Sequence, residues 1–316
     1  MSLLAVLALT TPPASIVSAL KEHVQFLASD TLAGRATPSP ELDMAAEYIA
    51  TRLSGAGAKP GVGESFFQIA IYREKPVRNV VAVIKGTDPK FVGQYVLVTA
   101  HYDHLGTRPS GEGDRINNGA NDNASGVASM IETARLLAVK PPKRNVAFIA
   151  FWGEERGLLG STYYGKNPVF PLKDTIADIN LEQMGRTDDS EQGDRKLTAD
   201  ITGAKFSEVS KILADAFKAK GLKLNLDAKP NEAYFVASDN AALALAGVPA
   251  HTLSVAYEFP DYHKPADEWP KLDYVNLASL TLGVAEGVKR IADLPTPPKW
   301  SEIPQTERFR KARNGE

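Results

Sequence analysis

The stretch that decides the fold runs from residue 95 to residue 160. It contains YVLVTAHYDHLG (95–106), NNGANDNASG (117–126) and NVAFIAFWGEERGLLG (145–160). The apolar runs are rich in β-branched and aromatic residues, which favours strands, and they end at clusters of His, Asp and Glu side chains. These side chains are the nitrogen and oxygen ligands of metal ions. The stretch therefore predicts a metal site at the edge of a sheet.

Strands and helices alternate around this stretch. Apolar residues between 127 and 137 recur at helical spacing, so a helix should begin next to Asp122. Residues 145–152 are almost continuously apolar, which is typical of a strand buried on both faces. Further elements are expected as helices at 15–28, 41–53, 207–221, 240–247 and 277–294, and as strands at 66–72, 79–86, 95–100, 176–181, 222–226 and 249–256.

This alternation predicts an α/β fold: a single domain with a central mixed, largely parallel twisted sheet and helices on both faces. We expect strands 79–86 and 95–100 to be neighbours in that sheet. The expected domain spans residues 15–294. An N-terminal arm or signal remnant (1–14) precedes it, and a proline-rich, charged tail (295–316) follows it and either wraps the surface or is partly disordered.

Composition excludes several classes of protein. The 316-residue chain is 43% hydrophobic, enough for a large core, and its net charge of -2 provides no basic field for nucleic acid. Without cysteine, any metal must be bound by His, Asp and Glu. No run reaches the length needed to insert stably into a membrane. The apolar LLAVLAL (3–9) resembles part of an export signal, which predicts a periplasmic or secreted protein.

The candidate ligands can meet in one crevice, because ligands of open α/β sheets bind beyond the carboxyl ends of the strands. His101, one of Glu154 and Glu155, and His263 follow expected strands, and Asp122 lies at a helix start. Glu182 follows the strand 176–181. Two imidazoles and three carboxylates suit a pair of zinc-like ions that share one bridging carboxylate and keep a position open for water, which favours hydrolysis.

Two further roles follow from position. Adjacent side chains on a strand point to opposite faces, so one of Glu154 and Glu155 is interpreted as a ligand and the other as a general base beside the metal water. Asp103 lies two residues after His101 and can accept the second ring N–H of that histidine. His104 is interpreted as a supporting or rim residue rather than a ligand, and His251 as a core or surface residue.

Five motifs in order carry a resemblance to a known family. HYDH (101–104), GANDNASG (119–126), GEERGLLGS (153–161), NLEQMG (180–185) and DYHKPADE (261–268) resemble the co-catalytic zinc aminopeptidases of the M28 peptidase family. LASDTLAGR (27–35) resembles the lead-in of that family. The resemblance spans about residues 26–291 and implies a zinc exopeptidase fold with two zinc ions per chain.

Carried over position by position, the resemblance assigns the residues of the site. It implies that His101 and Glu182 bind the first zinc, that Asp122 bridges both, and that Glu155 and His263 bind the second. It makes Glu154 the general base and implies a cis peptide after Asp122. The implied reaction is hydrolysis of the N-terminal peptide bond of a peptide or aminoacyl substrate by a metal-bridging hydroxide.

Some positions depart from the family or leave a choice. Asn240 occurs where relatives often have His, so the contribution of that histidine is absent or replaced. Tyr234 is preferred over Tyr257 as the phenol that hydrogen-bonds the tetrahedral intermediate. No insertion separates residues 66–72 from 79–86, so the protease-associated domain of some relatives should be missing there.

Other functions remain open from the sequence. A glutaminyl cyclase is an aminoacyl transferase on a similar fold that typically works with one zinc ion. A carboxypeptidase or dipeptidase is another possibility. A catalytically silent relative used for binding is disfavoured, because every ligand position and the position of the base are filled.

Overall fold

The structure, a computed structural model, describes residues 11–187, 195–226 and 230–316. The predicted arm or export-signal remnant falls mainly on residues 1–10, which lie outside the described residues, so it stays a prediction. Within the described ranges, no helix is both long enough and apolar enough to cross a bilayer.

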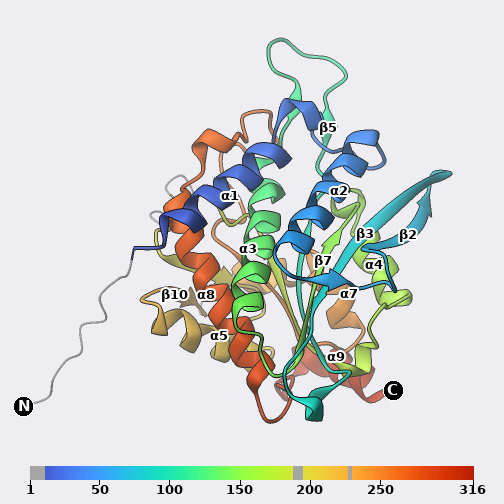
Figure 1. Cartoon of the computed structure of the whole chain (residues 1–316), viewed down its shortest axis with the longest axis vertical. Helices are drawn as coiled ribbons and strands as arrows, with labels where there is room; N and C mark the ends of the chain where they lie inside the picture. Colours follow the sequence, from blue (N-terminus) through green and yellow to red (C-terminus); the bar gives the residue numbers. More distant parts are fainter. Residues whose placement is uncertain (1–10, 188–194, 227–229) are drawn as a thin grey trace, which may run out of the picture.

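A mixed sheet forms the centre of the described chain (Figure 1). Its four inner strands, β7, β4, β8 and β11, are parallel, and antiparallel pairs flank them. The strand order is β1 (Lys59–Pro60), β3 (Lys75–Ile84), β7 (Asn145–Phe151), β4 (Tyr95–His101), β8 (Thr175–Glu182), β11 (Ala250–Ser254), β9 (Thr198–Ile201) and β10 (Lys223–Asn225), with β2 (Phe67–Tyr72) paired to β3.

The strand order corrects one expectation. β3 and β4 are not neighbours, because β7 lies between them and pairs with both. The insertion of β7 matters for the site, since it places the turn after β7 beside the end of β4. His101 is opposite Phe151 in the β4–β7 ladder, and Glu182 is opposite Ser254 in the β8–β11 ladder. The carboxyl ends of all four inner strands therefore lie at one edge of the sheet.

Helices cover both faces of the sheet, as predicted (Figure 1). One face packs against α1 (Ala14–Leu27), α2 (Pro40–Gly55), α3 (Gly126–Val139), α5 (Glu208–Ala219) and α8 (Tyr274–Asp293). The other face packs against α4 (Leu159–Lys166), α7 (Asn240–Leu245) and α9 (Glu307–Asn314). A short α6 (Pro230–Ala233) precedes α7. The sequence did not predict α4, α9 or β9.

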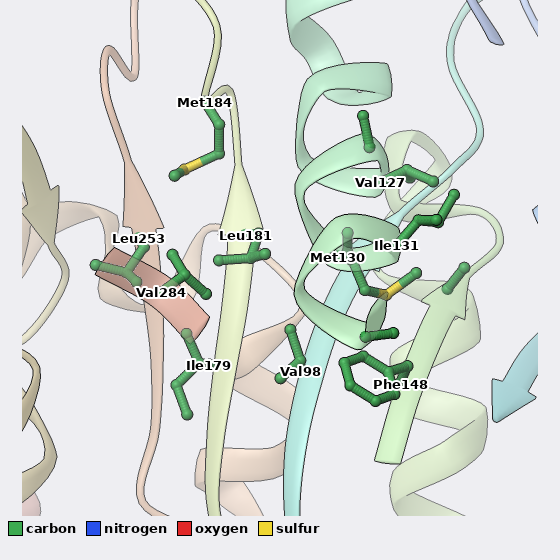
Figure 2. Packing of buried hydrophobic residues seen from close by; sticks show 14 of the residues in the cluster. Val98, Val127, Met130, Ile131, Phe148, Ile179, Leu181, Met184, Leu253 and Val284 are labelled. Atoms are coloured by element: carbon green, nitrogen blue, oxygen red, sulfur yellow. The ribbon is translucent and has the colours of Figure 1, made fainter. Parts of the chain in front are cut away.

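Apolar packing fixes α3, and with it the loop that carries Asp122. Figure 2 shows Val127, Met130 and Ile131 of α3 above side chains of the inner strands, among them Val98 and Phe148. Neighbouring strand residues bury the opposite face: Leu97 belongs to the second core. Because both faces are covered, these strands read as continuous apolar runs.

Two segments complete the fold near its ends. The hairpin of β5 (Gly106–Thr107) and β6 (Ile116–Asn117) projects at the top of Figure 1, beyond the edge that carries the strand ends. At the other end, the last 22 residues contain α9, and Phe309 of that helix is buried against Trp300 and Phe235. The domain boundaries stay a prediction.

Candidate metal centre

The first group of ligands lies at the ends of β4 and β8. His101 Nε2 is 3.0 Å from Glu182 Oε1 and 3.3 Å from Asp122 Oδ1. All three residues are buried, and their donor atoms lie within 4.8 Å of one another. We call this trio cluster 1.

The second group shares Asp122 with the first. His263 Nε2 is 3.3 Å from Asp122 Oδ2 and 3.3 Å from Glu155 Oε2. The donor atoms that lie within 4.8 Å of one another here belong to His104, Asp122 and Glu155. Because His263 faces both carboxylates, we call Asp122, Glu155 and His263 cluster 2. The two carboxylate oxygens of Asp122 therefore face different histidines, as a bridging ligand must.

The separations fit zinc ligands. Two atoms bound to one ion at about 2.0–2.1 Å in tetrahedral directions are about 3.3–3.4 Å apart. The contacts of Asp122 with His101 and His263 have that length. In addition, His263 Nε2 is buried and faces two carboxylate oxygens at 3.3 Å without the geometry of a hydrogen bond to either. A lone pair on that nitrogen would meet an ion held by the two carboxylates.

His104 supports cluster 2. Its ring is fully buried, and its Nδ1 is 2.6 Å from Glu155 Oε1 but 3.9 Å from Asp122 Oδ2. The 2.6 Å separation is that of a strong hydrogen bond and is too short for two ligands of one ion. His104 therefore holds one oxygen of Glu155 while the other oxygen faces His263. Of the two interpretations left by the sequence, the supporting role agrees with this geometry and the rim position does not.

Asp267 holds the loop of the bridging residue. Its carboxylate accepts the backbone N–H groups of Asn121 at 3.0 Å and Asp122 at 3.1 Å. The peptide between Asp122 and Asn123 is cis, which confirms that expectation. Gly119 begins the turn at φ 58°, and a side chain there would collide with the Asp122 carbonyl and the His104 ring. Asp267 lies in DYHKPADE, but only the fold reveals its role.

Arg35 joins the two loops that carry ligands. It is completely buried and donates hydrogen bonds to the carbonyls of Tyr102 at 2.9 Å, Asn118 at 2.7 Å and Gly119 at 3.1 Å. Burial lowers its pKa to about 10, and the nearby carboxylates of Asp103 and Asp122 oppose that shift. It therefore stays a cation at neutral pH and offsets part of the negative charge of the site. Sequence reasoning noted the motif around Arg35 but not this function.

Glu154 lies beside the ligands without joining either cluster. Burial raises the pKa of its carboxyl well above the ordinary value, and the charges of Glu182 and Asp239 add to that shift while His101 opposes it. Its backbone N–H donates to Asp103 Oδ1 at 3.0 Å. A carboxyl with a raised pKa next to metal ligands is suited to exchange protons.

Asp103 lies within ion-pair distance of His101 and contacts two further groups. Its carboxylate accepts hydrogen bonds from the Glu154 N–H and, at 2.9 Å, from the Thr37 hydroxyl. His101 Nδ1 is 3.7 Å from Asp103 Oδ1, which is longer than a hydrogen bond, and 3.3 Å from the Asp103 carbonyl oxygen. The backbone of Asp103 thus lies closer to His101 than its carboxylate does.

The carboxylates around His101 and His263 make the site strongly negative. Burial alone would lower the pKa of His101, but the carboxylates of Glu154 and Glu182 outweigh it and raise that pKa well above the ordinary value. Burial opposes the same shift at His263, where Asp122 and Glu155 raise the pKa to about 10. The surrounding carboxylates thus favour a positive charge at both histidine positions.

A pocket of about 130 Å³ opens beside Glu154 and Glu182. It is also lined by Gln183, Thr202, Tyr234, Ala237, Ser238, Thr252, Tyr257, Glu258 and Tyr262. Tyr234 and Tyr257 stack with ring centroids 4.8 Å apart, and the Tyr234 hydroxyl donates to Glu258 at 2.8 Å. Both tyrosines weighed from the sequence therefore line this pocket.

Tyr262 is a residue that the sequence reasoning missed. Its ring stacks on His263 at a centroid distance of 3.8 Å. Burial raises the pKa of its phenol above the ordinary value, and the charges of Asp122 and Glu155 add to the shift. The phenol therefore stays protonated beside the clusters and can donate a hydrogen bond. Its position directly before His263 was the available signal.

Asn240, which departs from the family pattern, is buried and part of a polar network. Its Oδ1 accepts from the Thr252 hydroxyl at 2.8 Å, and Asn180 Nδ2 donates to Thr252 at 3.1 Å and to Ser238 at 2.8 Å. The Ser238 hydroxyl donates to Glu182. Asn240 thus connects to a predicted metal ligand through hydrogen bonds and does not reach the clusters itself.

The chain resembles known proteins in sequence and in fold. Aminopeptidase YwaD of Bacillus subtilis is 34% identical over 123 residues, which cover 39% of this chain and 25% of that protein. The chain spans less than half the length of the first curated relatives it matches.

Two solved structures show the same fold. An aminopeptidase from Aneurinibacillus sp. strain AM-1 has a TM-score of 0.67 at 17% identity, with 91% of this chain and 96% of that chain covered. A glutaminyl cyclase of Bacteroides thetaiotaomicron bound to N-acetylhistamine has a TM-score of 0.66 at 20% identity, with 86% and 97% covered. Residues 79–288 match the family described as Peptidase family M28. The chain therefore belongs to peptidase family M28.

Proposed function

We propose that this chain is a zinc-dependent aminopeptidase that binds two zinc ions and hydrolyses the N-terminal bond of peptides or aminoacyl substrates. The observation that carries the proposal is the geometry of Asp122, whose two oxygens each lie 3.3 Å from a different histidine. Relatives named aminopeptidase and zinc metalloprotease support zinc as the metal.

We assign the ligand residues to two ions. His101 and Glu182 would hold the first, Glu155 and His263 the second, and Asp122 both. When bound, the ions polarise the substrate carbonyl and lower the pKa of water. His104 keeps Glu155 oriented through its hydrogen bond of 2.6 Å.

Glu154 is the proposed general base and then the general acid. It takes a proton from the attacking water and passes it to the leaving amine, for which its position beside both clusters and its raised pKa are suited. The hydrogen bond from its N–H to Asp103 fixes the turn from which the side chain extends.

Tyr262 is the proposed donor to the oxyanion of the tetrahedral intermediate. It stacks on His263 and lies close to the charges of both clusters. The Tyr234 hydroxyl already donates to Glu258. We therefore propose Tyr262 in place of Tyr234, with Tyr257, whose buried hydroxyl has no hydrogen-bond partner among the described residues, as the alternative donor.

Charge favours an amino end over a carboxyl end in the pocket. The described lining contains three glutamates and no lysine or arginine. With Glu182 as a ligand and Glu154 as the proton shuttle, Glu258 is the lining carboxylate left to attract the ammonium group of a peptide N-terminus and to repel a terminal carboxylate. This argues against a carboxypeptidase. The fold shared with a glutaminyl cyclase does not by itself support that second activity.

Replacing Glu154 by Gln tests the proposal. The variant should bind as much zinc as the wild type and lose about 10²–10⁴-fold in turnover of aminoacyl anilides, because the proton shuttle is removed while the ligands remain. Zinc content is measured by elemental analysis, and Glu64→Gln on the exposed surface is the matched control. Unchanged turnover in Glu154→Gln would refute the role of Glu154. If the wild type cyclises N-terminal glutaminyl peptides and hydrolyses none of the anilides, the proposed aminopeptidase function is wrong.

A further inference from the structure

The chemistry of the pocket beside Glu154 is unusual for a site that would select leucine-like side chains. Its described lining consists of three Tyr, three Ser or Thr, one Gln, one Ala and three Glu residues. Apolar contact comes from Ala237, from the tyrosine rings and from the carbon atoms of the polar side chains. The carboxylate and hydroxyl groups of the lining add partners for a polar or charged occupant.

Glu258 gives this pocket its distinctive charge. Among the described lining residues it is the carboxylate that belongs neither to the clusters nor to the proton shuttle. The hydrogen bond of 2.8 Å from the Tyr234 hydroxyl fixes Glu258 beside the stacked pair of Tyr234 and Tyr257, whose ring planes differ by 20°. A carboxylate beside aromatic faces is a combination that binds an ammonium or guanidinium group.

We infer that this pocket accepts the side chain of the substrate's N-terminal residue and selects lysine and arginine, with Glu258 as the residue that determines this preference. The inference rests on the proposed aminopeptidase function. The α-ammonium group and the scissile carbonyl would lie at the end of the pocket that contains Glu154 and Glu182. The cationic side chain would reach Glu258 and the stacked tyrosines.

A kinetic comparison of aminoacyl anilides tests the inference with the zinc-loaded wild type. The kcat/KM for lysyl and arginyl anilides should exceed that for the leucyl anilide by about tenfold, from an ion pair at the rim and a cation–π contact, with the glutamyl anilide the poorest substrate. Because Glu258 is exposed, the preference should weaken as sodium chloride is raised. Free lysine should inhibit more strongly than free leucine.

Variants of Glu258 make the test specific. Glu258→Gln should reduce the ratio of lysyl to leucyl kcat/KM several-fold, and Glu258→Lys should reverse the preference between lysyl and glutamyl anilides. Glu64→Gln should leave both ratios unchanged. Two results would overturn the preference and leave the proposed aminopeptidase function standing. One is faster cleavage of the leucyl anilide by the wild type, and the other is an equal loss of kcat/KM on every substrate in Glu258→Gln. Hydrolysis of none of the anilides would overturn the proposed function and this preference with it.

Discussion

The two ligand clusters that share Asp122 are built in different ways. In cluster 1, His101 and Glu182 are the last residues of β4 and β8, and both are buried. In cluster 2, Glu155 lies in the turn after β7. His263 lies in a loop at a positive φ of 57°, and its side chain is 37% exposed.

The difference shows what each location requires. Ligands on strands are positioned by the ladder itself, through the pairing of His101 with Phe151 and of Glu182 with Ser254. Ligands on loops need added supports: His104 holds Glu155, and Arg108 donates to the His263 carbonyl at 2.9 Å. Since a pre-positioned site loses less freedom on binding, we expect cluster 1 to bind its ion more tightly than cluster 2.

The largest effect is expected from breaking the shared residue. Asp122→Asn should lower the affinity for both ions by about 10³-fold or more. Loss of a residue that only hydrogen-bonds to a ligand already lowers metal affinity by about 10–100-fold, and Asp122 is itself a ligand of both ions. Zinc titration by calorimetry measures both affinities, with Asp215→Asn in an exposed part of α5 as the control. A variant that still binds two ions with wild-type affinity would show that Asp122 is no bridge.

The two histidines should separate the clusters. His263→Ala should lose the second ion and keep the first, at about one zinc per chain, because cluster 1 retains all its ligands. His101→Ala should lower the affinity of cluster 1 for its ion, which is expected to be the more tightly bound of the two. Elemental analysis after dialysis measures the occupancy. Loss of both ions in His263→Ala would show that the clusters do not bind independently.

A smaller effect is expected at His104. His104→Ala should lower the affinity for the second ion by about 10–100-fold, because Glu155 loses its hydrogen bond. The affinity for the first ion should not change. His104→Gln can restore part of that bond and should recover part of the affinity. Equal weakening of both ions would mean that His104 supports the whole fold and not cluster 2.

A separate effect, on stability and not on metal binding, is expected at a histidine that is as buried as His101 but lies outside the clusters. His251 contacts the Thr202 carbonyl at 2.8 Å and the Ser207 hydroxyl at 2.6 Å, and burial lowers its pKa to about 4. In the unfolded chain the same imidazole binds a proton near pH 6.5. Protonation below pH 6.5 therefore favours the unfolded chain, and the free energy of unfolding should fall by about 3 kcal/mol between pH 6.5 and pH 4.

Chemical denaturation across that range measures this pH dependence. His251→Gln should be less stable at neutral pH and should lose most of the slope between pH 4 and 6.5. An unchanged slope would assign the pH dependence to other groups. His251 differs from His101 in its surroundings, because carboxylates raise the pKa of His101 while burial alone lowers that of His251.

Local sequence patterns predicted the parts of the fold that are local. The apolar periodicity located α3 and β7, and the end of a strand identified His101, whereas Glu182 was singled out through the family resemblance. The order of strands was not accessible in the same way, because the pairing of β7 between β3 and β4 joins segments far apart in the chain. No local pattern specifies such a register.

The supporting residues were hidden for a similar reason. Arg35 acts on carbonyls more than 60 residues away, and Asp267 on the N–H of Asp122, 145 residues away. Backbone carbonyls and amides carry no residue identity, so their partners leave no pattern in the sequence. His104 and Tyr262 were adjacent to recognised motifs, but their roles depend on where their rings point.

The most direct test of the central claim is the zinc stoichiometry of the wild-type chain, measured by calorimetric titration of the metal-free protein and by elemental analysis at saturation. We predict two ions per chain, with unequal affinities and with the weaker ion removed first by a chelator. A single ion per chain at saturating zinc would contradict the account, because Asp122 would then have no second cluster to bridge.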